Sequence, residues 1–275
     1  MMTIFHMLKY VSIVVIVIYV IGLLLLFVFQ KKLIFFPEKL APDFKFATLP
    51  GDQEITITTK DRETISAIFF RGTGNDVILY FHGNAGSLNG WRHVAPDFTR
   101  HGYSILIIDY RGYGKSSGVI SESGFYLDAE AAYQWLLQNY EPEQIIVYGR
   151  SIGSGVATHL ASRRACKGLI LESAYTSLTT LASQKLPLAM PGLLLTTRFS
   201  SIEKLSSIKA PVILIHGGQD ELIPKEHSRK LLEKITTKKK LFILADAAHN
   251  DLNAFEEYHK IIGTTVPQFF SNNED

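Results

Sequence analysis

The sequence has one cysteine, Cys166, among 275 residues. No disulfide can therefore form within the chain, which excludes a small fold held together by cross-links. This scarcity fits a cytosolic domain, although a bacterial periplasmic domain can also lack disulfides. Cys166 follows a predicted helix, where we expect it to pack rather than to react.

A strong charge imbalance is also absent, because the net charge is only +2. Nucleic-acid binding would need a clustered basic face, so we expect no nucleic-acid partner. The nine histidines form no His-x-x-x-His pair with a helical glutamate, and there is no cysteine cluster. We therefore expect neither a metal site nor a cofactor.

Charged residues are missing from Tyr10 to Phe29, a run rich in Val, Ile and Leu. As a helix this run spans about 30 Å, enough to cross a bilayer. The alternative, a cleaved signal peptide, would have a shorter apolar region and a small-residue cleavage site, and residues 29–32 offer none. We predict that residues 1–30 are a single-pass membrane anchor, embedded through residues 10–29, that contributes nothing to the chemistry.

The side of the membrane on which the rest of the chain lies stays open. Lysines are more numerous after the apolar run than before it, which favours a cytoplasmic domain. A large translocated domain can carry the same charges, so this preference is slight.

The remaining residues, 31–275, are predicted to form one α/β domain. Residues 54–59 and 66–70 indicate an antiparallel hairpin. Apolar runs then predict strands near 77–82, 105–109, 144–149, 168–172, 211–216 and 240–245. Helical periodicity is expected near 88–101, 122–139, 152–164, 225–235 and 251–269. Strands alternating with helices imply right-handed crossovers and one doubly wound, mostly parallel sheet.

Gly149-Arg150-Ser151-Ile152-Gly153 follows a buried strand and precedes a helix. A serine flanked by glycines at such a turn is typical of the nucleophile elbow of an α/β-hydrolase fold. The glycines allow a tight turn that exposes the Ser151 hydroxyl. The alternative is an ordinary glycine-rich turn that closes packing or binds an anion at the helix N-terminus.

Asp220 and His249 each follow a later predicted strand, in the chain order Ser151, Asp220, His249 that α/β hydrolases have. Serine needs an adjacent base to attack, histidine can supply it near neutral pH, and an aspartate can orient the imidazole. We therefore predict these three residues to be catalytic.

The loop Tyr80 to Gly86 also follows an apolar strand. An oxyanion formed during attack needs backbone N–H donors, and we expect them from Ile152 and Asn84. His82 is expected to pack or to hydrogen-bond beneath this loop. Asp109 to Ser116 lacks the phosphate-loop pattern, and we expect Asp109 and Arg111 to stabilise it through buried charge-assisted bonds.

An insertion of about residues 175–207 separates two predicted strands at the position where α/β hydrolases place a cap. It is short and rich in leucine, and Pro187 and Pro191 break it into pieces. Its leucines would suit an acyl-chain substrate, or they simply pack on the sheet.

Taken together, these motifs resemble the membrane-anchored serine α/β-hydrolases, a branch that includes depalmitoylases and lysophospholipase-like proteins of animals and relatives in bacteria and fungi. The resemblance covers roughly residues 30–270 and departs from the family at no catalytic position. The matching stretches are 32–37, 80–86, 109–116, 149–153, 218–220 with 223–224, and 249–251. The resemblance implies the fold and the triad, and it leaves the substrate open among thioesters, lysophospholipids and other acyl compounds.

We therefore expect a membrane-tethered serine hydrolase that cleaves acyl ester or thioester bonds of lipid-like substrates through an acyl-enzyme. A serine peptidase of the same fold and a non-catalytic scaffold that retains the fold are the alternatives. The sequence indicates neither the acyl chain length nor the oligomeric state.

Overall fold

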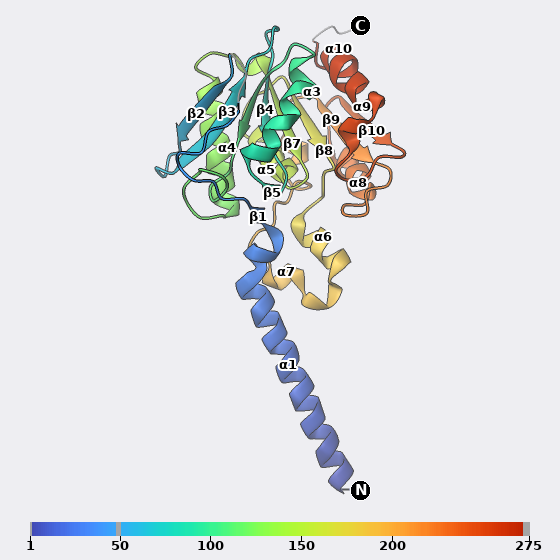
Figure 1. Cartoon of the computed structure of the whole chain (residues 1–275). Coiled ribbons are helices and arrows are strands. Elements are labelled where there is room, and N and C mark those ends of the chain that lie inside the picture. Colours follow the sequence, from blue (N-terminus) through green and yellow to red (C-terminus); the bar gives the residue numbers. More distant parts are fainter. Residues whose placement is uncertain (1, 48–50, 272–275) are drawn as a thin grey trace.

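The structure, a computed structural model, describes residues 2–47 and 51–271 (Figure 1). Within these residues a central eight-stranded sheet has the order β10-β9-β8-β7-β4-β6-β3-β2. Its strands are β2 Gln53–Thr58, β3 Thr64–Phe70, β4 Val77–Phe81, β6 Ser104–Ile108, β7 Ile145–Arg150, β8 Gly168–Glu172, β9 Val212–Gly217 and β10 Lys239–Leu244. The β2–β3 and β3–β6 pairs are antiparallel, and all other neighbours in the sheet are parallel. The predicted mostly parallel sheet is confirmed.

The inner strands are buried on both faces, so their sequences are nearly continuous apolar runs rather than alternating ones. One apolar core lies between the sheet and the helices α4 Glu122–Leu136, α5 Gly153–Ala161 and α8 Glu226–Lys234. A second core lies on the opposite face, against α3 Ala95–Thr99, α9 Glu256–Lys260 and α10 Val266–Phe270. Because helices cover both faces of the sheet, the carboxyl ends of the parallel strands are where a site can form.

Two predicted helices are broken in the structure. The stretch 88–101 consists of α2 Leu88–Trp91, a 3-10 turn Arg92–Val94 and α3, with Pro96 in the first turn of α3. Proline lacks an N–H and so favours the start of a new helical segment. The stretch 251–269 contains a 3-10 turn Leu252–Ala254, α9, a π-helical turn Ile261–Thr265 and α10, which has Pro267 in its first turn.

The N-terminal helix α1, Met2–Ile34, projects from the domain as a long stalk (Figure 1). Among the described residues it is the one helix long and apolar enough to cross a membrane, over Ile4–Ile34, and it is therefore a candidate transmembrane span. It continues four residues beyond the predicted end of the anchor at residue 30. The short strand β1, Phe36–Pro37, then pairs in parallel with β5, Ala85–Gly86, which joins the helix to the loop after β4.

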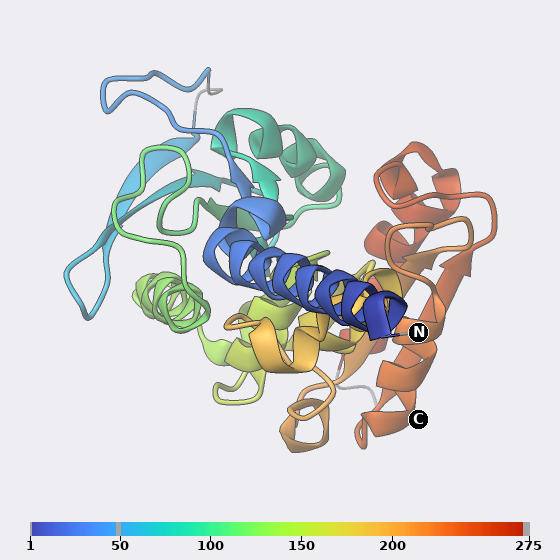
Figure 2. The same ribbon diagram turned by 90° about the horizontal axis from the view of Figure 1, so that it is seen from below.

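The insertion between β8 and β9 forms a small cap of three short segments: α6 Leu178–Lys185, a 3-10 turn Pro187–Ala189 and α7 Pro191–Leu194. Pro187 and Pro191 begin the second and third segments, as predicted from their lack of an N–H. The cap lies beside the domain-proximal half of α1, and the view along the helix shows α7 against it (Figure 2). Cap and helix therefore stand together at one end of the molecule.

Candidate active site

Ser151 lies in the turn between β7 and α5, and its backbone has a positive φ of 53°. A side chain in this region is strained, and the flanking glycines make the turn possible. A Cβ on Gly153 would lie 2.1 Å from the Phe81 carbonyl oxygen, and one on Gly149 would lie 2.5 Å from the Gly153 carbonyl oxygen. Only glycine at both positions lets α5 start this close to β4 and β7.

The structure brings together the three predicted residues, with His249 between Ser151 and Asp220 and within hydrogen-bonding distance of each. The His249 Nε2 atom is 3.0 Å from Ser151 Oγ, and its Nδ1 atom is 2.7 Å from Asp220 Oδ2. The residues follow β7, β9 and β10, so all three lie at the carboxyl edge of the sheet. Because Nδ1 faces a carboxylate, the proton belongs on Nδ1, which leaves Nε2 able to accept the serine proton.

The carboxylate of Asp220 is held by several donors. Its Oδ1 atom accepts the N–H groups of Leu222, at 3.0 Å, and Ile223, at 2.8 Å. The Nε2 atom of His216 is 3.4 Å from Oδ2. Burial raises the pKa of Asp220, but the hydrogen bonds from His216, His249 and Ile223 outweigh it, and the pKa lies well below its ordinary value. Asp220 is therefore a charged partner for His249 throughout the neutral range.

Arg150, next to the serine, supports the loop that carries His249. Its guanidinium donates to the His249 carbonyl at 3.3 Å and to Asn250 Oδ1 at 3.4 Å. On its other side Arg150 Nε is 3.0 Å from Glu172 Oε1, and both side chains are buried. The sequence analysis gives neither residue a function. The signal that could have found them is that each is a charged residue at the end of a buried strand.

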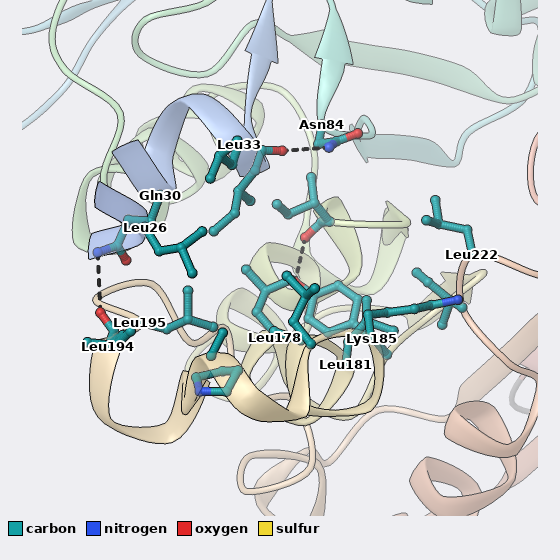
Figure 3. A pocket seen from close by; sticks show the side chains of 18 of the residues that line it. Leu26, Gln30, Leu33, Asn84, Leu178, Leu181, Lys185, Leu194, Leu195 and Leu222 are labelled. Atoms are coloured by element: carbon teal, nitrogen blue, oxygen red, sulfur yellow. Dashed lines mark hydrogen bonds between the residues drawn. The ribbon is translucent and has the colours of Figure 1, made fainter. Parts of the chain in front are cut away.

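The two predicted oxyanion donors, Asn84 and Ile152, line the same pocket as Ser151. The Asn84 carbonyl accepts the N–H of Phe36, at 3.0 Å, and its side-chain amide donates to the Ile34 carbonyl at 2.7 Å (Figure 3). The Tyr175 hydroxyl donates to the Ile152 carbonyl at 3.1 Å. These bonds fix the backbone on both sides of the serine hydroxyl.

The other histidines near the strand ends have structural contacts. His82 is buried, its Nδ1 atom is 2.6 Å from the Gly83 carbonyl oxygen, and its ring stacks on Trp91. His216 is buried as well, with Nδ1 2.6 Å from Ser228 Oγ and Nε2 2.8 Å from the Ile223 carbonyl oxygen. Neither histidine lines the pocket beside Ser151.

The Asp109–Ser116 loop also lies outside that pocket. Arg111 pairs with Asp128 and Asp61, while Asp109 accepts the Leu88 N–H at 2.9 Å and faces His82. Burial raises the pKa of Asp109. In the part of the chain that the structure describes, no group of three or more His, Cys, Asp or Glu side chains could hold a metal ion.

The pocket above Ser151 has a volume of about 360 Å³ and apolar walls. Leucines of the cap and of α1 surround it, with Asn84 and Leu222 at its rim (Figure 3). Lys185 is its one charged residue among those described, and the Lys185 ammonium donates to the Glu221 carbonyl at 2.7 Å. The pocket suits a hydrocarbon chain better than a charged ligand.

Comparison with known proteins gives the same fold. The family described as alpha/beta hydrolase fold matches residues 76–207. The uncharacterized protein Rv2307c of Mycobacterium tuberculosis is 32% identical over 227 residues, which is 81% of this chain and 81% of the relative. Lysophosphatidylserine lipase ABHD12 of Danio rerio is 33% identical over 215 residues, covering 70% of this chain and 56% of that protein.

Among solved structures, the Pyrococcus furiosus esterase Pf2001 superposes with a TM-score of 0.70 at 23% identity, covering 86% of this chain and 99% of the esterase. At this identity the likeness shows the fold alone. The sequence relatives and the matched family carry the assignment further: the chain belongs to the α/β-hydrolase family.

Proposed function

We propose that the protein is a membrane-tethered serine hydrolase that cleaves acyl ester or thioester bonds of lipid-like molecules. The observation that carries this proposal is the hydrogen-bonding distance of 3.0 Å between His249 Nε2 and Ser151 Oγ at the base of an apolar pocket. A serine with a base in contact, and a carboxylate behind that base, is the arrangement that covalent acyl transfer needs.

In the proposed reaction, Ser151 Oγ attacks the acyl carbonyl carbon while His249 Nε2 takes the hydroxyl proton. Asp220 keeps the other ring proton on Nδ1 and stabilises the imidazolium. The N–H groups of Ile152 and Asn84 bind the oxyanion. His249 then gives its proton to the leaving alcohol or thiol, which leaves the acyl group on Ser151.

The second half of the reaction repeats these steps with water. His249 takes a proton from a water molecule while the water oxygen attacks the acyl-serine carbonyl. Collapse of the new intermediate releases the carboxylic acid, and the proton returns from His249 to Ser151 Oγ. No cofactor or metal ion enters this scheme.

The substrate class follows from the pocket. Its leucine-rich walls would bury a hydrocarbon chain at a gain of about 0.8 kcal/mol per methylene group. The name of one similar protein, a lysophosphatidylserine lipase, supports acyl-ester chemistry. The tether is α1, whose uncharged run is bounded by Lys9 on one side and Lys31 on the other.

Two other functions are less well supported. A peptidase needs a group that captures the terminal amine or carboxylate of a peptide, and Lys185, the one charged residue of the pocket among those described, is bonded to the Glu221 carbonyl. A non-catalytic scaffold would have no reason to keep His249 in contact with both Ser151 and Asp220.

A substrate panel tests the proposal. Purified full-length protein in phosphatidylcholine vesicles should hydrolyse acyl esters and thioesters, and it should leave peptide amides intact. Release of alcohol, thiol or amine is measured for each compound. Preferential cleavage of the amides would favour the peptidase, and no turnover of any compound would favour the scaffold.

A further inference from the structure

The last turns of α1 form one wall of the pocket above Ser151. Four residues of this helix line the pocket: Leu26, Gln30, Leu33 and Ile34. Their spacing puts them on one face of the helix. The cap leucines stand opposite, and the pocket lies between the two (Figure 3). The expectation that residues 1–30 only anchor the protein does not anticipate Leu26 and Gln30 at the pocket.

Gln30 fastens this wall to the cap. Its side chain is 6% exposed, and its amide donates to the Leu194 carbonyl at 3.2 Å. Its Oε1 atom accepts the backbone N–H of Thr196 at 2.8 Å and the hydroxyl of the same residue at 3.0 Å. A buried amide with this many bonds holds α1 and the cap in one arrangement.

A second polar contact lies deeper along the helix. The Tyr19 hydroxyl donates to the Leu188 carbonyl in the cap at 2.6 Å. Twelve residues separate Tyr19 from Lys31, which is about 18 Å of helix. With Lys31 at the membrane surface, this contact lies inside a hydrocarbon core of about 30 Å. A cap carbonyl at that depth needs a donor from the protein, and Tyr19 supplies it.

The outer surface of the cap is also suited to hydrocarbon. Leu188 is 80% exposed and Leu193 is 79% exposed, and Leu186 and Met190 are exposed as well. Lys185 is the only charged residue between Ser177 and Thr197. In water these leucines would expose a large apolar surface beside a membrane helix, whereas in a bilayer they are solvated by lipid.

A groove of about 540 Å³ lies next to the pocket, between residues 19–26 of α1 and residues 185–189 of the cap. It shares Leu26, Lys185, Leu186 and Ala189 with the pocket above Ser151. An almost entirely apolar path therefore leads from the middle of the span to the serine.

We infer that α1 is a wall of the acyl-binding pocket, and that the acyl chain of a membrane lipid enters sideways from the bilayer between α1 and the cap. This inference rests on the proposed function. The lipid carbonyl reaches Ser151 while its chain stays in apolar surroundings along the path. At the end of the same helix, the Ile34 carbonyl accepts a hydrogen bond from the Asn84 side-chain amide. The helix therefore also holds the loop that lies beside the lipid carbonyl.

A matched pair of variants on α1 tests this inference. Leu26→Trp fills the pocket wall. Val28→Trp makes the same change two residues away, about 200° around the helix, at a side chain that is 66% exposed and lines neither the pocket nor the groove. Each protein is reconstituted in phosphatidylcholine vesicles, and kcat/KM is measured for a palmitoyl ester and a butyryl ester of the same fluorogenic alcohol.

If about two methylene groups of the acyl chain are no longer buried, kcat/KM should fall roughly tenfold. Leu26→Trp should therefore lower the palmitoyl-to-butyryl ratio of kcat/KM by about tenfold or more. Val28→Trp should change this ratio by less than about twofold. Equal ratios in the two variants, with the wild type active, would overturn the inference and leave the proposed function standing.

A wild type that hydrolyses neither ester would remove the proposed function and this inference with it. Folding of each variant is checked with a fluorophosphonate probe, which needs an intact serine site. If Leu26→Trp does not fold, Leu26→Phe is compared with Val28→Phe in the same assay. A palmitoyl-to-butyryl ratio that is equal in this second pair also overturns the inference.

Discussion

At the scale of single residues, the candidate site depends on which histidine contacts the serine. Four histidines lie near the carboxyl end of a strand or in the helix that follows one: His82, His159, His216 and His249. Among the described residues, His249 alone has a nitrogen within hydrogen-bonding distance of Ser151. Sequence order selected the same residue. Its role as a base stays a prediction, and so do the roles of Ser151 and Asp220.

The choice of His249 over His216 can be tested by mutation. His249→Ala should lower kcat by on the order of 10³-fold or more with little change in melting temperature, because the base is lost and few packing contacts go with it. His216→Ala should keep measurable hydrolysis and lose stability by about 1–3 kcal/mol, because its buried partners Ser228 and Ile223 are left unpaired. A well-folded His216→Ala protein as inactive as His249→Ala would contradict the assignment.

The charge of Asp220 determines the expected pH dependence of kcat/KM. Asp220 has a pKa well below its ordinary value, so it stays ionised while the pH falls through the range in which an imidazole takes up a proton. The acid side of the kcat/KM profile should then follow a single ionisation, with the rate rising as the pH rises. A second proton on the acid limb would show that Asp220 titrates there and that its hydrogen bonds do not hold it charged.

The residues around Ser151, Asp220 and His249 were harder to predict from the sequence. A buried Arg150 and Glu172 look in sequence like charged ends of strands, and only the fold brings them under the His249 loop. Gln30 looks like the polar end of an apolar run. One of its four bonds is to the Phe27 carbonyl within α1, and the other three join α1 to Leu194 and Thr196, more than 160 residues away, which no local pattern encodes.

At the scale of elements, the strands were predicted closely because inner parallel strands are buried on both faces and give uninterrupted apolar runs. The helical stretches predicted near 88–101 and 251–269 consist of segments of different helix type, which apolar spacing does not show. The insertion of about residues 175–207 lies between β8 and β9 and holds α6 and α7. Its contact with α1 could not be predicted, because an apolar run looks the same whether it faces lipid or another helix.

The junction of β7 with α5 gives an element-scale prediction. Gly153→Ala should destabilise the protein by about 2 kcal/mol or more, because the new Cβ would overlap the Phe81 carbonyl oxygen at 2.1 Å and force α5 away from β4. The melting temperature should fall by roughly 4–8 °C. Gly90→Ala is the control, since nothing lies within 4 Å of its Cβ position. A Gly153→Ala protein as stable as this control would show that close approach does not set the turn.

At the scale of the whole molecule, the anchor and the domain share the candidate site. Contacts of Asn84 and β1 join α1 to the loop after β4, and contacts of Gln30 and Tyr19 join α1 to the cap. A domain that only needed a tether would be free to use a flexible linker. We therefore propose that α1 serves both membrane attachment and acyl binding, in one assembly around Ser151.

The central claim is that Ser151 forms the acyl-enzyme, and one labelling measurement tests it most directly. Full-length protein in vesicles is treated with a fluorophosphonate probe, digested, and mapped by mass spectrometry. We predict one adduct, on Ser151. We also predict that Ser151→Ala is not labelled and has kcat lowered by on the order of 10³-fold or more while it keeps its fold. An adduct on another residue, or labelling of Ser151→Ala at the wild-type rate, would contradict the account.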